Sequence, residues 1–104
     1  MLDAPAKSAP AKAVIMASKY VTGRHGVSGL NGVTSRESRR RRGWVLVSGR
    51  YRRPSPGGRW AVWLLFYDQR WLVEYGGLDE QAARPPKGSG VPCDIRPAFA
   101  KPAC

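Results

Sequence analysis

The chain has 104 residues, room for one domain, and its 18 Lys and Arg against seven Asp and Glu give a formal net charge of +11. A compact domain with that imbalance repels itself unless an anionic partner offsets the charge, so we expect a polyanion partner rather than charge that serves only solubility. The only apolar run near the N-terminus, Val14-Ile15-Met16, is too short for a signal-peptide core or a membrane span. We therefore expect a cytoplasmic protein that does not associate with membranes.

Both ends of the chain are predicted to be flexible, with one small domain at residues 13–84 between them. Residues 1–12 are a basic Ala/Pro/Lys segment that cannot bury enough apolar area to offset its ordering entropy, which predicts a disordered tail. Residues 85–104 are rich in Pro and Gly and are predicted to form a C-terminal tail. Cys93 and Cys104 both lie there, where a bridge would constrain little, so the sequence favours reduced thiols without settling whether they pair.

The first regular element is expected near residues 11–20. Their alanine content favours a short helix that begins after Pro10, although an edge strand around residues 14–21 is the alternative. Residues 22–35 contain four glycines and several Ser and Thr, which is typical of a loop. Within that loop, Asn31-Gly32 is compatible with a hairpin turn that leads to a strand beginning at Val33.

A three-stranded antiparallel meander at residues 44–75 is the clearest structure that the sequence predicts. Its strands are expected at residues 44–53, 59–67 and 70–75. A short helix is predicted at residues 78–84, which begin with acidic and end with basic residues before Pro85-Pro86 stops them. The fold class is therefore mainly β, a small α+β protein with a three- to five-stranded antiparallel meander or small barrel and one or two short helices.

The pairing of the first two strands follows from the Pro/Gly-rich loop at residues 54–58. If that loop closes symmetrically, Arg53 faces Arg59, and Gly49 faces Trp63, whose indole would cover the glycine backbone. The strand at 59–67 is apolar on both faces, so it must be the central one. The register of the third strand depends on whether Asp68-Gln69 forms a two-residue turn, and the sequence leaves that open.

Arginine side chains supply the candidate binding surface. Ten of the 13 arginines lie between Arg36 and Arg70, in the segment most expected to fold. A guanidinium group is a planar fork that grips a phosphate in two places and stacks on bases, and each neutralised phosphate makes binding more sensitive to salt. The residues predicted to contact phosphate are Arg36, Arg39, Arg40, Arg41, Arg42, Arg50, Arg52, Arg53 and Arg59.

Aromatic side chains are concentrated in the same segment, with eight of the ten between Trp44 and Tyr75. Aromatic rings on an exposed sheet face are what single-strand-binding proteins use to stack bases. A domain this small also needs most of its rings for its core, and Trp60, Phe66 and Trp71 are assigned to it. The rings predicted to be available for stacking are Trp63, Tyr51 and Tyr67.

Catalytic and metal-binding patterns are weak in this chain. His25 is the only histidine, and a ribonuclease-like site that combines it with Arg24 and Glu74 is an alternative to a simple exposed histidine in a Gly-rich loop. His25, Cys93 and Cys104 lack the paired spacing of a zinc site. We therefore predict no catalytic residue, no metal site and no cofactor.

The function predicted from these patterns is that of a small, non-enzymatic nucleic-acid-binding protein whose partner is DNA or RNA. The alternative is an inhibitor or accessory protein of the phage or plasmid type, which would use the same charge to occupy an acidic or nucleic-acid-binding groove of a host protein. A structural role in a ribonucleoprotein is a third hypothesis. The sequence does not choose between DNA and RNA, and it predicts neither a sequence preference nor an oligomeric state.

Overall fold

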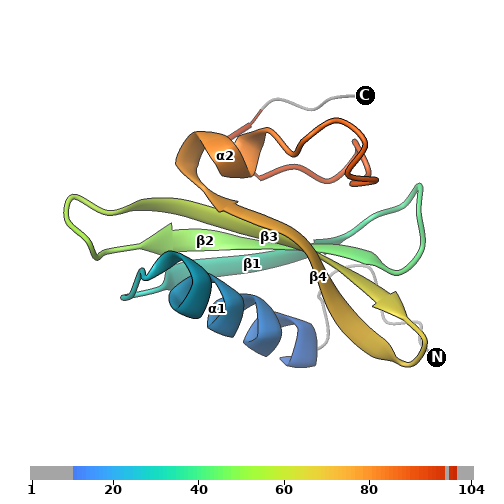
Figure 1. Cartoon of the computed structure of the whole chain (residues 1–104), viewed down its shortest axis with the longest axis horizontal. Helices are drawn as coiled ribbons and strands as arrows, with labels where there is room; N and C mark the ends of the chain where they lie inside the picture. Colours follow the sequence, from blue (N-terminus) through green and yellow to red (C-terminus); the bar gives the residue numbers. More distant parts are fainter. Residues whose placement is uncertain (1–10, 98, 101–104) are drawn as a thin grey trace.

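A computed structural model describes residues 11–97, 99 and 100, which form one open antiparallel sheet of four strands with two short helices (Figure 1). The elements in chain order are α1 (Ala11–His25), β1 (Asn31–Glu37), β2 (Trp44–Tyr51), β3 (Gly58–Tyr67), β4 (Arg70–Leu78) and α2 (Asp79–Ala83). The strands lie side by side in the order β1-β2-β3-β4. The mainly β meander is confirmed, and the barrel alternative is wrong because β1 and β4 lie at opposite edges of the sheet.

Helix α1 confirms the helical alternative for the first element and extends five residues beyond the expected end. Its buried residues, Ala13, Ala17 and Val21, recur every fourth position and so lie along one side of the helix. They pack on a sheet face that carries Val45, Val47, Tyr51, Trp60, Val62 and Leu64, which we call the α1 face. Residues 1–10 lie outside the described residues, so the basic tail expected at residues 1–12 is seen only at Ala11 and Lys12, where α1 begins.

Strand β1 lies inside the segment that the sequence assigned to a loop. Asn31 pairs with Arg50 instead of turning a hairpin, and Gly32, with φ of 61°, lies where the register between β1 and β2 shifts. Most of the strand is exposed, including Val33 at 39%. The loop assignment is wrong at residues 31–35. This edge strand is held by backbone pairing with β2, and its side chains are mostly exposed, so its sequence shows little of the apolar alternation that predicts a strand.

The register of β2 on β3 also differs from the expected one. Gly49 lies opposite Trp60 instead of Trp63, and Arg50, not Arg53, lies opposite Arg59. A Cβ atom on Gly49 would lie 3.1 Å from the Trp60 ring, so the indole does cover a glycine, but it is a different indole. The connection is longer than the symmetrical loop expected, because Tyr51 is the last residue of β2 to pair. β3 is nevertheless central and buried on both faces, as predicted.

The hairpin between β3 and β4 answers the question that the sequence left open. Tyr67 pairs with Arg70, and Asp68 and Gln69 between them have φ of 53° and 67°, so they form a two-residue turn with both residues in the left-handed region. The register shifts once, between Trp63 and Leu64 of β3. β4 then continues to Leu78, three residues beyond the predicted end.

The second face of the sheet is covered by α2 and by the chain that follows it (Figure 1, orange). We call it the C-terminal face; its buried residues are Trp44, Leu46, Ala61, Trp63, Ala82 and Ile95. Helix α2 confirms the short helix predicted before Pro85-Pro86. Cys93 is disulfide-bonded, so the expectation of a reduced thiol is wrong for this residue, and Cys104 lies outside the described residues. No helix in the described part of the chain is long and apolar enough to span a membrane.

Candidate nucleic-acid interface

All nine candidate arginines are exposed, but the structure places them at two ends of the sheet. Arg39 to Arg42 lie in the connection from β1 to β2, whereas Arg52 and Arg53 follow the last residue of β2. The eight residues of β2 separate these two groups, a distance of about 25 Å along an extended strand. The arginines therefore form two separate basic surfaces instead of one continuous face.

The first surface is a hollow at the end of the sheet where β2 connects to β3. It has a volume of about 410 Å³, and we call it the arginine hollow. It is lined by Asn31, Arg50, Tyr51, Arg52, Pro56, Gly57, Gly58 and Arg59. The hollow is shallow and open to solvent, and three of the side chains that line it carry guanidinium groups.

Arg50 and Arg59 are directly opposite each other on β2 and β3. Side chains in this position point to the same face and lie close together, so two like charges there repel. The Arg50 Nε atom lies 3.4 Å from the Asn31 side-chain oxygen, and the Arg59 guanidinium lies 5.3 Å from the centre of the Phe99 ring. Neither guanidinium group is bonded to a carboxylate of a described residue.

The acidic group beside the hollow, Asp79, already has two donors. Its Oδ1 atom accepts a 3.0 Å hydrogen bond from the backbone N–H of Arg59, and its Oδ2 atom accepts a 2.9 Å bond from the Tyr51 hydroxyl. Burial, reinforced by that hydrogen bond and by the charge of Asp79, raises the pKa of Tyr51 above its ordinary value of 10.0. Asp79 thus holds the backbone at the start of β3, and its hydrogen bonds go to the Arg59 backbone and the Tyr51 hydroxyl instead of to a guanidinium group.

The second surface is the connection between β1 and β2, residues 38–43, which we call the arginine loop. Its backbone closes around the Asp94 carboxylate, which accepts hydrogen bonds from the Ser38 hydroxyl at 2.8 Å and from the backbone N–H groups of Arg39 and Arg40 at 2.9 and 3.3 Å. The Ser38 hydroxyl oxygen in turn accepts the N–H groups of Arg40 and Arg41. The backbone N–H groups of Arg39, Arg40 and Arg41 therefore have acceptors within the protein.

The side chains of the arginine loop differ in what they contact. Arg41 donates a 2.8 Å hydrogen bond to the Gly90 carbonyl, and its guanidinium lies 5.6 Å from the centre of the Trp44 ring. Arg36, just before the loop on β1, donates to the Arg96 carbonyl. These two arginines hold the C-terminal segment on the sheet, whereas the side chains of Arg39, Arg40 and Arg42 make no contact of this kind with a described residue.

The Asp94 carboxylate is ionised more easily than an ordinary aspartate. Burial acts to raise its pKa, but the hydrogen bonds from Ser38, Arg39 and Arg40 outweigh that effect and lower the pKa below 3.8. A carboxylate that accepts several N–H and O–H donors is stabilised in its charged form. Asp94 therefore acts as an internal anion at the base of the arginine loop.

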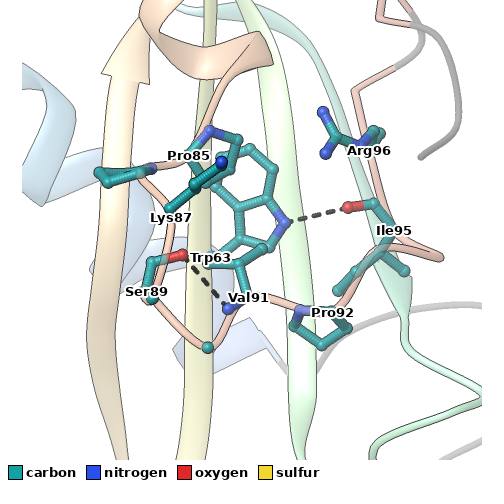
Figure 2. Close-up of a pocket in the computed structure, with 11 residues that line it drawn as sticks. Trp63, Pro85, Lys87, Ser89, Val91, Pro92, Ile95 and Arg96 are labelled. Atoms are coloured by element: carbon teal, nitrogen blue, oxygen red, sulfur yellow. Dashed lines mark hydrogen bonds between the residues drawn. The ribbon is translucent and has the colours of Figure 1, made fainter. Parts of the chain in front are cut away.

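Two of the three rings predicted to stack are buried. Trp63 has no exposed surface, and its indole N–H donates a 3.0 Å hydrogen bond to the Ile95 carbonyl beneath the C-terminal segment (Figure 2). Tyr51 is 9% exposed and its hydroxyl is engaged by Asp79. The expectation that these two rings stack on bases does not fit their burial, because the chain after α2 covers one and α1 packs on the face that holds the other.

The third candidate, Tyr67, is 66% exposed, and its neighbour Phe66 is 43% exposed. The expectation that Phe66 belongs to the core is therefore wrong, although its ring lies against that of Trp71, with ring centres 5.1 Å apart. The sequence feature that could have predicted the exposure of Phe66 and Tyr67 is their position next to the Asp68-Gln69 turn. Residues beside a hairpin turn lie beyond the helices and loops that cover the middle of a sheet.

His25 is a partly buried residue of α1, so the expectation of an exposed histidine in a Gly-rich loop is wrong. The ring lies at the end of α1 with its edge against Tyr20, 5.9 Å between centres, and no carboxylate of a described residue hydrogen-bonds to it. Among residues 11–97, 99 and 100, no group of three or more His, Cys, Asp or Glu side chains is arranged to hold a metal ion.

No protein-family model, curated protein or solved structure matches this chain. Its function is therefore inferred from the side chains of the arginine hollow and the arginine loop.

Proposed function

We propose that this protein binds nucleic acid without catalysis, through contacts between arginine side chains and phosphate groups. The observation that carries the proposal is the directly opposed pair Arg50 and Arg59 in the arginine hollow, with Arg52 beside it and no hydrogen bond from either guanidinium group to a carboxylate of a described residue. Two opposed cations are destabilising by themselves, and an anion between them removes the repulsion. A phosphate group has the charge and the acceptor geometry that guanidinium groups match.

The arginine loop supports the same proposal at the other end of β2. Because Asp94 and Ser38 accept the backbone N–H groups of Arg39, Arg40 and Arg41, the protein itself shapes this part of the loop. The exposed side chains of Arg39, Arg40 and Arg42 then present three positive charges on a preformed turn. A preformed surface loses less entropy on binding than a flexible arm would.

The test is the affinity of fluorescently labelled DNA and RNA, measured by anisotropy over a series of salt concentrations. We expect the double variant Arg50→Gln/Arg59→Gln to bind more weakly and to lower the slope of log affinity against log salt, by about 0.9 per lost phosphate contact on duplex DNA. Glutamine keeps part of the aliphatic stem, so packing changes little. The matched control is Lys12→Gln/Lys19→Gln, which removes two exposed charges from α1.

If the two double variants lost affinity equally, binding would depend on net charge alone, and the arginine hollow would have no specific role. Absence of binding by the natural chain even at low salt would overturn the proposal as a whole. The competing hypothesis, an acidic protein partner, predicts a single stoichiometric protein in a pulldown that survives nuclease treatment. The nucleic-acid proposal predicts that nuclease releases the bound partners.

A further inference from the structure

The hairpin tip formed by Phe66, Tyr67, Asp68, Gln69 and Arg70 presents exposed aromatic surface at the same end of the sheet as the arginine loop. Tyr67 and Phe66 are the two exposed large aromatic residues of the described chain, and they are adjacent in sequence. Successive residues of a strand point to opposite faces, so the two rings diverge. Phe66 faces Trp71, which packs against the α1 face, whereas Tyr67 makes no ring contact with a described residue.

Two arginines lie on the segments next to Tyr67. Its cross-strand partner is Arg70, whose side chain leaves the same face of the hairpin. The arginine loop is joined to the tip by a 2.9 Å hydrogen bond from the Phe66 N–H to the Gly43 carbonyl, which brings Arg42 next to the end of β3. The one acidic residue of the tip is Asp68, in the turn itself.

We propose that the hairpin tip and the arginine loop bind single-stranded nucleic acid, with the Tyr67 ring stacked on an unpaired base while Arg70 and Arg42 contact the adjoining phosphates. This inference rests on the proposed nucleic-acid-binding function and names its partner class. A single strand offers the faces of its bases to an aromatic ring. In a duplex those faces are stacked on neighbouring pairs, and a ring gains access only by unstacking them at a cost of a few kcal/mol.

The experiment compares labelled oligothymidylate with the oligoadenylate–oligothymidylate duplex of the same length, by anisotropy at one salt concentration and then over a salt series. The natural chain is expected to bind the single strand more tightly than the duplex. Tyr67→Ala is expected to weaken single-strand binding about five- to hundredfold, the usual loss for one stacked base, and to leave duplex binding within about twofold. Tyr67→Phe keeps the ring and is expected to bind like the natural chain.

The salt series separates stacking from charge. Tyr67→Ala should leave the salt slope unchanged because the ring makes no phosphate contact, whereas Arg70→Gln should reduce it by about 0.7, the value for one contact on a single strand. Ile15→Ala is the control for loss of exposed apolar surface, since Ile15 is 54% exposed on α1. It is expected to alter neither affinity nor slope.

Three outcomes overturn the inference. The Tyr67→Ala variant could bind the single strand as tightly as the natural chain does, or it could lose the same fraction of its affinity for the single strand and for the duplex. The third outcome is a natural chain that binds the duplex more tightly than the single strand. In each of these cases the proposed function is still supported if nucleic-acid binding weakens with added salt and with substitution of Arg50 and Arg59. A natural chain that binds neither ligand overturns both proposals together.

Discussion

The Ser38 hydroxyl donates a 2.8 Å hydrogen bond to the Asp94 carboxylate, which lies 56 residues further along the chain. The second oxygen of Asp94 accepts the backbone N–H groups of Arg39 and Arg40. One carboxylate thus shapes the turn that displays the arginine run and holds the C-terminal segment beside it. Its removal should therefore affect stability and the basic surface together.

Asp94→Asn should lower the free energy of unfolding by about 1–3 kcal/mol, because an amide is neutral and can accept through only one of its two polar atoms. Urea denaturation at neutral pH measures the change. Asp68→Asn, in the exposed hairpin turn, is the control and should leave the midpoint nearly unchanged. Equal stability of Asp94→Asn and the natural chain would mean that the loop does not depend on this carboxylate.

The contribution of Asp94 should also depend on pH in one direction. Its pKa is lower in the folded chain than the ordinary 3.8, so its stabilising effect is fully present above that value and is lost as pH falls through the lower folded pKa. The difference in unfolding free energy between the natural chain and Asp94→Asn should therefore be constant near neutrality and shrink below about pH 4. A difference that grew on acidification would contradict the assignment.

Two glycine substitutions should change stability with opposite signs. A Cβ on Gly49 would lie 2.9 Å from the Asn31 carbonyl oxygen and 3.1 Å from the Trp60 ring, so Gly49→Ala should destabilise by about 1–3 kcal/mol. Gly23 has no atom within 4 Å of its Cβ position and lies in α1, so Gly23→Ala should stabilise by about 0.5–1 kcal/mol. Thermal melts of both variants check the pair. A stabilising Gly49→Ala would show that β2 and β3 do not keep this register.

Charge reversal in the arginine hollow should separate stability from binding. Arg50→Glu replaces a repulsive cross-strand pair with an attractive one opposite Arg59, which is expected to stabilise the fold by a few tenths of a kcal/mol at low salt. The same change should weaken nucleic-acid binding more than Arg50→Gln does. Melting temperature and anisotropy, measured on one preparation, give both results. A variant that melts lower and binds equally well would contradict both expectations.

Several features could be predicted from local sequence because their cause is local. β3 is apolar on both faces, so it had to be central, and the breaks at Pro54-Ser55-Pro56-Gly57-Gly58 and Asp68-Gln69 had to separate strands. Alanine content favoured helix over strand for α1. The sequence also shows where the arginines lie along the chain. Their division between two ends of the sheet depends on how β2 pairs with its neighbours, which only the structure shows.

Other features were out of reach because their cause lies far away in the chain. β1 has little hydrophobic pattern and is a strand only through its bonds to β2. The observed register places Gly49 opposite Trp60 instead of Trp63, and this shift by three residues moves the β3 side chains to the opposite face relative to those of β2. Residues 85–97 look featureless alone, yet Ile95 covers Trp63 and Asp94 shapes the arginine loop.

The sequence by itself determined the charge, the strand-rich centre and the coincidence of arginine with aromatic residues, because composition and short-range periodicity carry that information. Only the tertiary structure decided which rings and which guanidinium groups face solvent. A strand's side chains alternate between faces, so the exposure of Trp63 or Tyr67 depends on what covers each face. That cover, α1 on one side and the C-terminal segment on the other, is a long-range property of the folded chain.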